Sequence, residues 1–304
     1  ENKANQKLNK LRYGENPHQT GYIQVNESEN GIANSILISG KKMSYNNYLD
    51  ADVAFNSTNN FKENCVSIVK HTNICGFSIN SNQLKAFKDA IKGDPVSAYG
   101  GILGFNSTLK KDVAKEITKS FFEIVIAPNF TYQALEILKK RKNLRIIEAK
   151  YSPSNQLYYR SISGGLLAQS QNLDEKYDLK IVTKNKPSDK ELEDLKFAWK
   201  LCSFIKSNAI ILAKNKTLLG MGAGQPNRVM SVKIAGEVAG EKSIGCVMAS
   251  DAFFPFPDSI IKANDLGVKS IIQPGGSIND SDVIEEANNR GMSMIFTNQR
   301  RFTH

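Results

Sequence analysis

The stretch Cys65-Val-Ser-Ile-Val-Lys-His-Thr-Asn-Ile-Cys-Gly76 joins an apolar, β-branched run to a Lys-His pair. The run predicts a buried strand at residues 67–69, and Cys75-Gly76 predicts a turn after it. A strand that ends in Lys70 and His71 places a proton acceptor next to a fixed positive charge. This arrangement is unsuited to a core and suits a reactive site.

Along the rest of the chain, short apolar runs alternate with segments of helical periodicity, which predicts α/β layers. Strands are expected at residues 67–69, 102–105, 124–126, 210–213, 245–249, 270–273 and 292–296. Helices are expected at residues 50–61, 83–91, 111–121, 131–142, 189–207, 229–239, 258–266 and 280–290. Ser188, followed by Glu191, predicts a capping box at the start of the 189–207 helix.

Two stretches look like versions of one unit. The first has a strand, the Cys-Gly turn, a helix and Asp94-Pro-Val-Ser-Ala-Tyr-Gly-Gly101. The second has a strand, a turn at Gly220-Met-Gly-Ala-Gly224, a helix and Ser250-Asp-Ala-Phe-Phe-Pro-Phe-Pro-Asp258. A period of roughly 140 residues is too long for a solenoid and predicts a duplicated domain. The polar stretch 184–189 predicts the boundary between domains 1–184 and 185–304.

The length of 304 residues favours two domains, and 40% hydrophobic with 23% charged residues is typical of a soluble globular protein. No apolar run reaches the ~18 residues of a membrane span, and the start of the chain lacks a secretory apolar region, so no membrane partner is expected. The four cysteines (Cys65, Cys75, Cys202 and Cys246) form no CxxC pair. This predicts a reducing, cytoplasmic location and disfavours zinc.

The formal net charge of +10 predicts an anionic partner or a lysine-rich solvated surface. The chain has no run of six basic residues and no interleaving of aromatic with basic residues. Both patterns are typical of nucleic-acid binding, so nucleic acid is not the expected partner.

The Lys70-His71 pair has a definite chemical use. An unperturbed imidazole has a pKa of ~6.5, and an adjacent ammonium favours its neutral form. A neutral imidazole can accept a proton, and the lysine can stabilise a developing negative charge. The competing interpretation is a strand end whose Lys and His make ordinary hydrogen bonds.

The other two histidines, His18 and His304, lie in polar motifs, Arg12-Tyr-Gly-Glu-Asn-Pro-His18 and Arg300-Arg-Phe-Thr-His304. Arg12 can bind a phosphate or carboxylate, and Tyr13 can stack on a ring. The competing interpretation is an N-terminal segment that is simply tied onto the domain.

Two further motifs could contact a ligand. Phe253-Phe-Pro-Phe256 lies between Asp251 and Asp258, and it is either a core loop or an aromatic wall for a flat heteroaromatic ligand. The glycine-rich 220–224 segment is a weak nucleotide fingerprint. It is better interpreted as a tight strand-to-helix turn, with Arg228 at the helix start free to meet an anion.

Together these motifs resemble the aminoimidazole carboxamide ribonucleotide (AICAR) transformylase domain of the bifunctional purine-biosynthesis enzymes, in order from about residue 11 to residue 304. The resemblance implies two cytidine-deaminase-like α/β/α subdomains without the deaminases' zinc. It also implies a homodimer with active sites at the subunit interface. The matching stretches include Arg-Tyr-Gly-Glu-Asn-Pro-His, Ser-Tyr-Asn-Asn-Tyr-Leu-Asp-Ala-Asp, Lys-His-Thr-Asn-Ile-Cys-Gly, Phe-Ala-Trp-Lys, Gly-Ala-Gly-Gln, Ser-Asp-Ala-Phe-Phe-Pro-Phe-Pro-Asp and Gln-Pro-Gly-Gly-Ser.

The family transfers the formyl group of 10-formyltetrahydrofolate to the 5-amino group of AICAR, a step in the synthesis of IMP. By resemblance, His71 would be the base, Lys70 the electrostatic stabiliser and Asn208 an orienting residue. The residues that would hold the ribonucleotide are Arg12, Tyr13, Gly100, Glu123, Arg228, Phe253 and Arg300. Those that would line the folate site are Val229, Asp258, Gln273 and Pro274.

Several positions depart from the family pattern. Ile74 replaces a proline, Pro226-Asn227 replaces Met-Ser, and Thr303 replaces His or Arg. The family's N-terminal IMP cyclohydrolase domain has no counterpart here, so this chain is expected to formylate but not to close the purine ring. A structural potassium ion is compatible with the resemblance. The alternatives are a non-catalytic protein that binds nucleotides or another polyanion, and a zinc deaminase, which would need bound metal.

Overall fold

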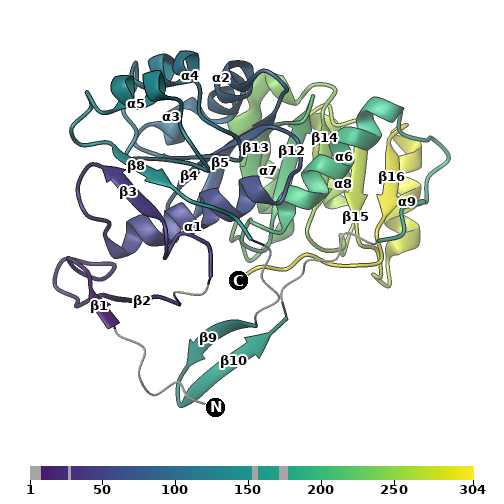
Figure 1. Cartoon of the computed structure of the whole chain (residues 1–304). Helices are drawn as coiled ribbons and strands as arrows, with labels where there is room; N and C mark the ends of the chain where they lie inside the picture. The colour runs from purple at the N-terminus through teal and green to yellow at the C-terminus, as the bar shows by residue number, and fades with distance from the viewer. Residues whose placement is uncertain (1–7, 27–28, 153–156, 171–176) are drawn as a thin grey trace.

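The computed structural model describes residues 8–26, 29–152, 157–170 and 177–304, and these form a mixed α/β protein (Figure 1). The strands of the main sheet are β3 (Ile36–Ser39), β4 (Cys65–Lys70), β5 (Asn73–Ile79), β6 (Ile102–Phe105), β7 (Ile124–Ala127), β8 (Arg145–Glu148), β11 (Lys180–Ile181), β12 (Ile210–Lys214), β13 (Thr217–Gly222), β14 (Val247–Ser250), β15 (Ser270–Gln273) and β16 (Ser293–Phe296). Two separate hairpins are β1 (Leu8–Lys10) with β2 (Tyr22–Gln24), and β9 (Tyr158–Ile162) with β10 (Gly165–Gln169).

The helices alternate with the strands along the chain. They are α1 (Tyr45–Asn59), α2 (Gln83–Gly93), α3 (Pro95–Ala98), α4 (Lys111–Ile117), α5 (Tyr132–Leu138), α6 (Asp189–Cys202), α7 (Arg228–Ala239), the 3-10 helix η1 (Gly240–Ser243), α8 (Asp258–Asp265) and α9 (Asp280–Asn289). The main sheet of the described residues has the order β11-β16-β15-β14-β12-β13-β5-β4-β6-β7-β8-β3.

The two halves of this sheet are built in the same order. The first runs α1-β4-β5-α2-β6-α4-β7-α5-β8 and the second α6-β12-β13-α7-β14-α8-β15-α9-β16, apart from the short α3 and η1. In each half the first strand pairs antiparallel with the second and third, and the last three strands are parallel. The halves meet where β5 runs antiparallel to β13, with Ser78 opposite Thr217.

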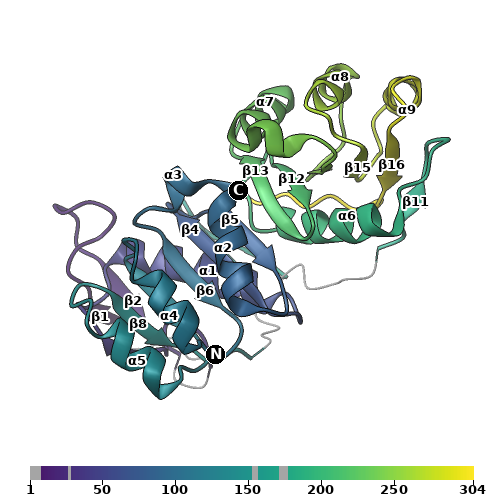
Figure 2. The ribbon, with the colours of Figure 1, turned by 90° about the horizontal axis from the view of Figure 1, so that it is seen from above.

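Helices cover both faces of the sheet. One apolar cluster lies between the sheet and α1 and α6, and it spans both halves: Phe61 and Phe77 of the first half contact Phe197 of the second. On the other face α2, α4 and α5 cover one cluster, and α7, α8 and α9 cover another. Figure 2 shows α7, α8 and α9 in a row on one side of the second half, with α6 on the opposite side. The shared α1/α6 cluster therefore joins the halves.

Most predicted elements are confirmed, with shifted ends. The strand predicted at residues 270–273 is β15, and the one predicted at 102–105 is β6. The Ser188 capping box is present: Ser188 caps Glu191, whose side chain in turn accepts from the Ser188 backbone N–H. The predicted 189–207 helix ends at Cys202, and the predicted 111–121 helix ends at Ile117.

The turn predicted at Cys75-Gly76 was wrong, and of the strand-to-helix turn predicted at residues 220–224 only the last two residues lie between β13 and α7. Gly76 lies inside β5 and Gly220 inside β13, and the chain reverses earlier, at His71-Thr72 and at Asn215-Lys216. The glycines serve helix packing instead of chain reversal. A Cβ on Gly76 would come within 2.3 Å of the Ala90 carbonyl oxygen in α2, and one on Gly220 within 2.2 Å of the corresponding Ala235 oxygen in α7. A strand glycine can mark close approach of backbone as well as a turn, and here it marks the former.

We expect Gly76→Ala to lower the free energy of unfolding by about 1–3 kcal/mol, because the added methyl meets helix backbone that cannot rotate away. Urea unfolding of the whole chain measures this change. Gly165→Ala in β10 is the control, since nothing lies within 4 Å of the Cβ position there. Equal effects of the two substitutions would contradict the packing role assigned to Gly76.

Candidate functional site

The β4–β5 hairpin presents the predicted Lys-His pair at one end of the central strands of the sheet. Lys70 pairs with Asn73 across the two-residue turn formed by His71 and Thr72, and the side chain of His71 is exposed. The Lys70 ammonium donates to the Tyr99 carbonyl oxygen at 2.5 Å. The next residue, Gly100, has φ of 73°, and its backbone N–H donates to Phe121. Lys70 and Gly100 therefore lie close together, next to the turn that carries His71.

Asp50 of α1 belongs to the same neighbourhood and was missed by the sequence analysis. Its Oδ1 accepts the backbone N–H of Thr72 at 2.6 Å. Burial raises the pKa of Asp50, while the hydrogen bond from Thr72 and the charge of His71 act in the opposite direction. The available signal was its position in a helix that begins at the Ser44 capping box, but nothing in the spacing links it to a turn formed later in the chain.

Glu123 lies between this hairpin and the N-terminal motif. The Asn47 side chain donates to Glu123 Oε2 at 3.2 Å, and Arg145 Nη1 lies 3.7 Å from the same oxygen. Burial lowers the pKa of Arg145; Glu123 opposes this, and the charge of Arg12 adds to it. The Arg12 guanidinium also lies 5.5 Å from the centre of the Tyr13 ring. The structure thus brings Arg12, Tyr13 and Glu123 into one charged region.

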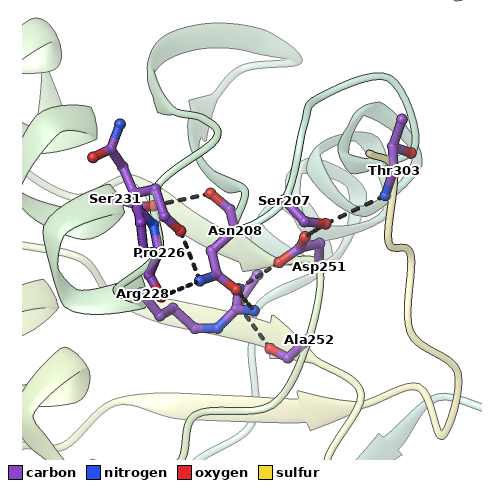
Figure 3. Close-up of polar contacts among 10 residues, drawn as sticks. Ser207, Asn208, Pro226, Arg228, Ser231, Asp251, Ala252 and Thr303 are labelled. Atoms are coloured by element: carbon purple, nitrogen blue, oxygen red, sulfur yellow. Dashed lines mark hydrogen bonds and ion pairs between the residues drawn. The ribbon is translucent and has the colours of Figure 1, made fainter.

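A second polar cluster surrounds Asn208 at the start of β12 (Figure 3). The Arg228 guanidinium donates to Asn208 Oδ1 at 2.5 Å, to Ser250 Oγ at 2.9 Å and to Asp251. The Asn208 amide donates to the carbonyl oxygens of Gln225 at 2.8 Å and Pro226 at 3.1 Å. Asn208 therefore ties β12 to the loop before α7.

The C-terminal segment is bound to the same network. Asp251 is fully buried and accepts from Ser207 as well as from Arg228. The Ser207 backbone N–H donates to the Thr303 carbonyl oxygen at 2.8 Å, and the Thr303 N–H donates back to Ser207 Oγ at 3.3 Å. The peptide bond between Ser207 and Asn208 is cis.

The departures from the family pattern fit this geometry. Pro226 and Thr303 join the network through backbone atoms, which any residue type can supply. Asn227 caps α7 by accepting the Val229 N–H at 3.0 Å. Ile74 is fully buried in β5.

Arg228 was predicted to be free at the helix start to meet an anion. In the structure its guanidinium is 7% exposed and is engaged by Asp251, Ser250 and Asn208. The helix start is therefore not an open anion site, because a buried carboxylate already neutralises the arginine.

The remaining predicted residues lie near the second cluster along the chain, with different exposures. Phe253 is 41% exposed and Phe254 fully buried, so the aromatic motif is partly core and partly surface. Asp258 is exposed, and Arg300 lies over the Phe302 ring at 4.8 Å. Val229 is half-buried. Gln273 and Pro274 are buried, and Gln273 Oε1 accepts the Gly275 N–H at 3.2 Å.

Strand register puts the two clusters at the same end of the central strands of the sheet. Ile210, two residues after Asn208, is opposite both Gly222 and Ser250. Since β13 is antiparallel to β5, its last residues lie on the side where β5 begins, next to the Lys70 turn. His71 and Asn208 thus lie at the same end of the strands, although they are far apart in the sequence.

Within the described ranges, no group of three His, Cys, Asp or Glu side chains could hold a metal ion. The same residues include no helix that is long and apolar enough to cross a bilayer. All four cysteines are free and buried.

We expect Arg228→Leu to destabilise the protein by about 3–5 kcal/mol, because it leaves the buried Asp251 carboxylate without its cation. Chemical denaturation measures the loss. Lys85→Ala, which breaks the exposed Lys85–Asp89 pair, is the matched control and should cost at most about 1 kcal/mol. A loss for Arg228→Leu as small as that of the control would contradict the buried pair.

The family and its relatives agree with the motifs that build these clusters. A model of the family described as "AICARFT/IMPCHase bienzyme" matches residues 1–238. The chain is 46% identical, over 98% of its length, to the bifunctional purine biosynthesis protein purH of Dictyostelium discoideum. It is 45% identical over 98% to PurH of Persephonella marina and 47% identical over 99% to PurH of a Thermoanaerobacter species. It spans 58%, 60% and 60% of the length of these three relatives. The chain therefore belongs to the AICARFT/IMPCHase bienzyme family.

Proposed function

We propose that this chain transfers the formyl group of 10-formyltetrahydrofolate to the 5-amino group of AICAR, releasing the 5-formamido ribonucleotide and tetrahydrofolate. The observation that carries the proposal is the exposed His71 on the hairpin turn beside Lys70. This turn lies at the same end of the strands as Asn208. Family membership supports the reaction class. The relatives are named bifunctional, and the proposal concerns the formyl transfer.

The proposed chemistry matches the two side chains of the hairpin. The AICAR amine is a poor nucleophile, because its lone pair is delocalised toward the neighbouring carboxamide. His71 accepts a proton from that amine as nitrogen attacks the formyl carbon. The Lys70 ammonium stabilises the negative charge on the former carbonyl oxygen. The bond from carbon to N10 of the folate then breaks, and N10 takes up a proton.

The other site residues have proposed binding roles. Near the β4–β5 turn, the ribonucleotide would be held by Arg12, Tyr13, Gly100 and Glu123. Phe253 and Arg300 would hold it on the other side, and Arg228, which is buried against Asp251, would keep Asn208 oriented. Val229, Asp258, Gln273 and Pro274 would line the folate site. The buried side chain of Gln273 limits it to shaping the wall of that site.

We also propose that the two halves are copies of one cytidine-deaminase-like α/β/α subdomain, with the boundary at residues 184–185. Equivalent side-chain contacts support the duplication. Lys214 in the second half donates to the Ile244 carbonyl oxygen at 2.9 Å, as Lys70 does to Tyr99. The residues that follow these carbonyls, Gly245 and Gly100, both have positive φ.

The protein is proposed to act as a homodimer with active sites at the subunit interface. The β9–β10 hairpin supports this, because each of its strand residues is exposed and several are large and apolar. In Figure 1 it extends away from the main sheet. An isolated two-stranded hairpin is marginally stable in water, so a second copy of the chain is the expected cover.

A structural potassium ion is proposed from the family resemblance alone, with no residues assigned to it. A cytoplasmic location is proposed as well, since four free buried thiols suit a reducing compartment. Zinc has no part in the proposed reaction.

His71→Ala should reduce turnover by about 10²–10⁴-fold, because the base that takes the amine proton is gone. Affinity for AICAR should change by less than about tenfold, since the contacts assigned to ribonucleotide binding remain. Spectrophotometric release of tetrahydrofolate, with and without AICAR, measures the reaction, and calorimetry measures binding.

The matched control is Asn215→Ala, at the same turn position in the second half, and it should keep wild-type turnover. Retained turnover in His71→Ala would refute the assigned base. A wild-type chain that binds AICAR but releases no tetrahydrofolate would favour the alternative, a non-catalytic nucleotide- or polyanion-binding protein.

Leu166→Asp in β10 should weaken self-association by at least about tenfold, because the charge would have to be buried in the interface. Sedimentation velocity over a range of concentrations measures the change. Ile278→Asp, at a side chain that is 97% exposed, should leave association as in the wild type. If the wild type is monomeric throughout that range, the dimer proposal is wrong.

A further inference from the structure

The turn that carries His71 has a backbone geometry that its residues do not favour. His71 and Thr72 have φ of 51° and 60°. Two-residue turns with two positive φ values are usually made by glycine or asparagine, and a β-branched residue such as threonine is an outlier there. Such a conformation persists only where surrounding contacts impose it.

Two side chains bind the backbone of this turn: Asn73 donates to the His71 carbonyl oxygen at 2.9 Å, and a carboxylate reaches the turn from α1. Asp50 Oδ1 accepts the Thr72 backbone N–H at 2.6 Å, and the rest of α1 and all of β4 lie between the two residues in the sequence. The N–H groups of a turn point outward and need an acceptor, and a carboxylate is a strong one. The carboxylate also lies close enough to His71 for the imidazole charge to act on it.

In the second half, a helix aspartate also accepts backbone N–H groups of a two-residue turn, but that turn contains no histidine. Asp194 of α6 accepts the N–H groups of Asn215 at 2.8 Å and Lys216 at 2.6 Å. Those two residues have φ of 54° and 52°. Each aspartate lies in the helix that starts at a Ser capping box, Ser44 or Ser188. The fold therefore contains two aspartate-held turns, of which only the first places an imidazole at its tip.

We infer that Asp50 is a positioning residue for His71: it holds the turn backbone in the conformation that presents the imidazole. This inference rests on the proposed function for its effect on turnover. His71 is exposed and lies at the tip of the turn, so the orientation of its backbone decides where the imidazole points. Misplacement of a reacting group by about 1 Å can cost on the order of 100-fold in rate.

The experiment compares three variants of the whole chain. Asp50→Ala removes the acceptor, Asp50→Asn keeps an oxygen that can accept the same N–H without the charge, and Asp194→Ala removes the equivalent acceptor in the other half. Tetrahydrofolate release gives kcat and the KM for AICAR. Amide hydrogen exchange, followed by mass spectrometry, reports separately on the Lys70–Asn73 and Lys214–Thr217 turns.

Asp50→Ala should lower kcat by roughly 10- to 100-fold with little change in KM, because chemistry needs the oriented imidazole and binding does not. In this variant the amides of the Lys70–Asn73 turn should lose protection against hydrogen exchange. Asp50→Asn should restore kcat to within about fivefold of the wild type, since a neutral acceptor still holds the N–H. Asp194→Ala should lose protection only at the second turn and keep its kcat.

Two results would overturn the inference. The first is unchanged protection of the His71 turn in Asp50→Ala, which would mean that other contacts hold it. The second is an Asp50→Asn variant as slow as Asp50→Ala, which would assign the effect to the charge and not to the backbone contact. If the wild type shows no tetrahydrofolate release, the proposed function fails, while the exchange data still decide whether Asp50 holds the turn.

Discussion

The antiparallel contact between β5 and β13 is the feature on which the site depends. It joins two half-sheets through the Ser78–Thr217 hydroxyl pair, 2.8 Å apart and buried, and through the Ile79 N–H, which donates to Lys216 at 3.0 Å. Lys242 reinforces the junction by donating to the last carbonyls of α2 in the other half. Because β13 runs antiparallel to β5, the start of β12 and the end of β4 lie at the same end of the strands. Without it, His71 and Asn208 would belong to unrelated surfaces.

The two clusters at that end of the strands have different physical character. The hairpin cluster is open: His71 is exposed and Glu123 half-buried. The Asn208 cluster is closed, since Arg228 and Asp251 are buried and their hydrogen-bonding groups are engaged with each other and with Ser207, Ser250 and Asn208. A buried charge pair of this kind is poor evidence for stability but gives a rigid arrangement when its partners are satisfied. The proposed base is therefore exposed, at the same end of the strands as a rigid polar cluster.

The proposed duplication separates general features of the fold from features of the site. Lys70 and Lys214 make the same contact with a carbonyl that precedes a left-handed glycine, and Asp50 and Asp194 hold the same kind of turn. These contacts recur in both halves, so they belong to the architecture. The imidazole at position 71, where the other half has Asn215, does not recur. The proposed chemistry is therefore assigned to a residue type that the corresponding turn of the other half lacks.

The sequence by itself determined the α/β layers, most of the helices, the Ser188 cap and the motifs that identify the family, because these depend on local periodicity and residue type. It also indicated Lys70, His71 and Asn208. Only the tertiary structure showed that Gly76 and Gly220 lie inside strands, because their reason is a helix carbonyl that packs against them. The engagement of Arg228 by Asp251 and the contact of Asp50 with the His71 turn were likewise decided by the fold. Each joins residues distant in the chain, and hydrophobic periodicity carries no information about which polar groups such a fold brings together.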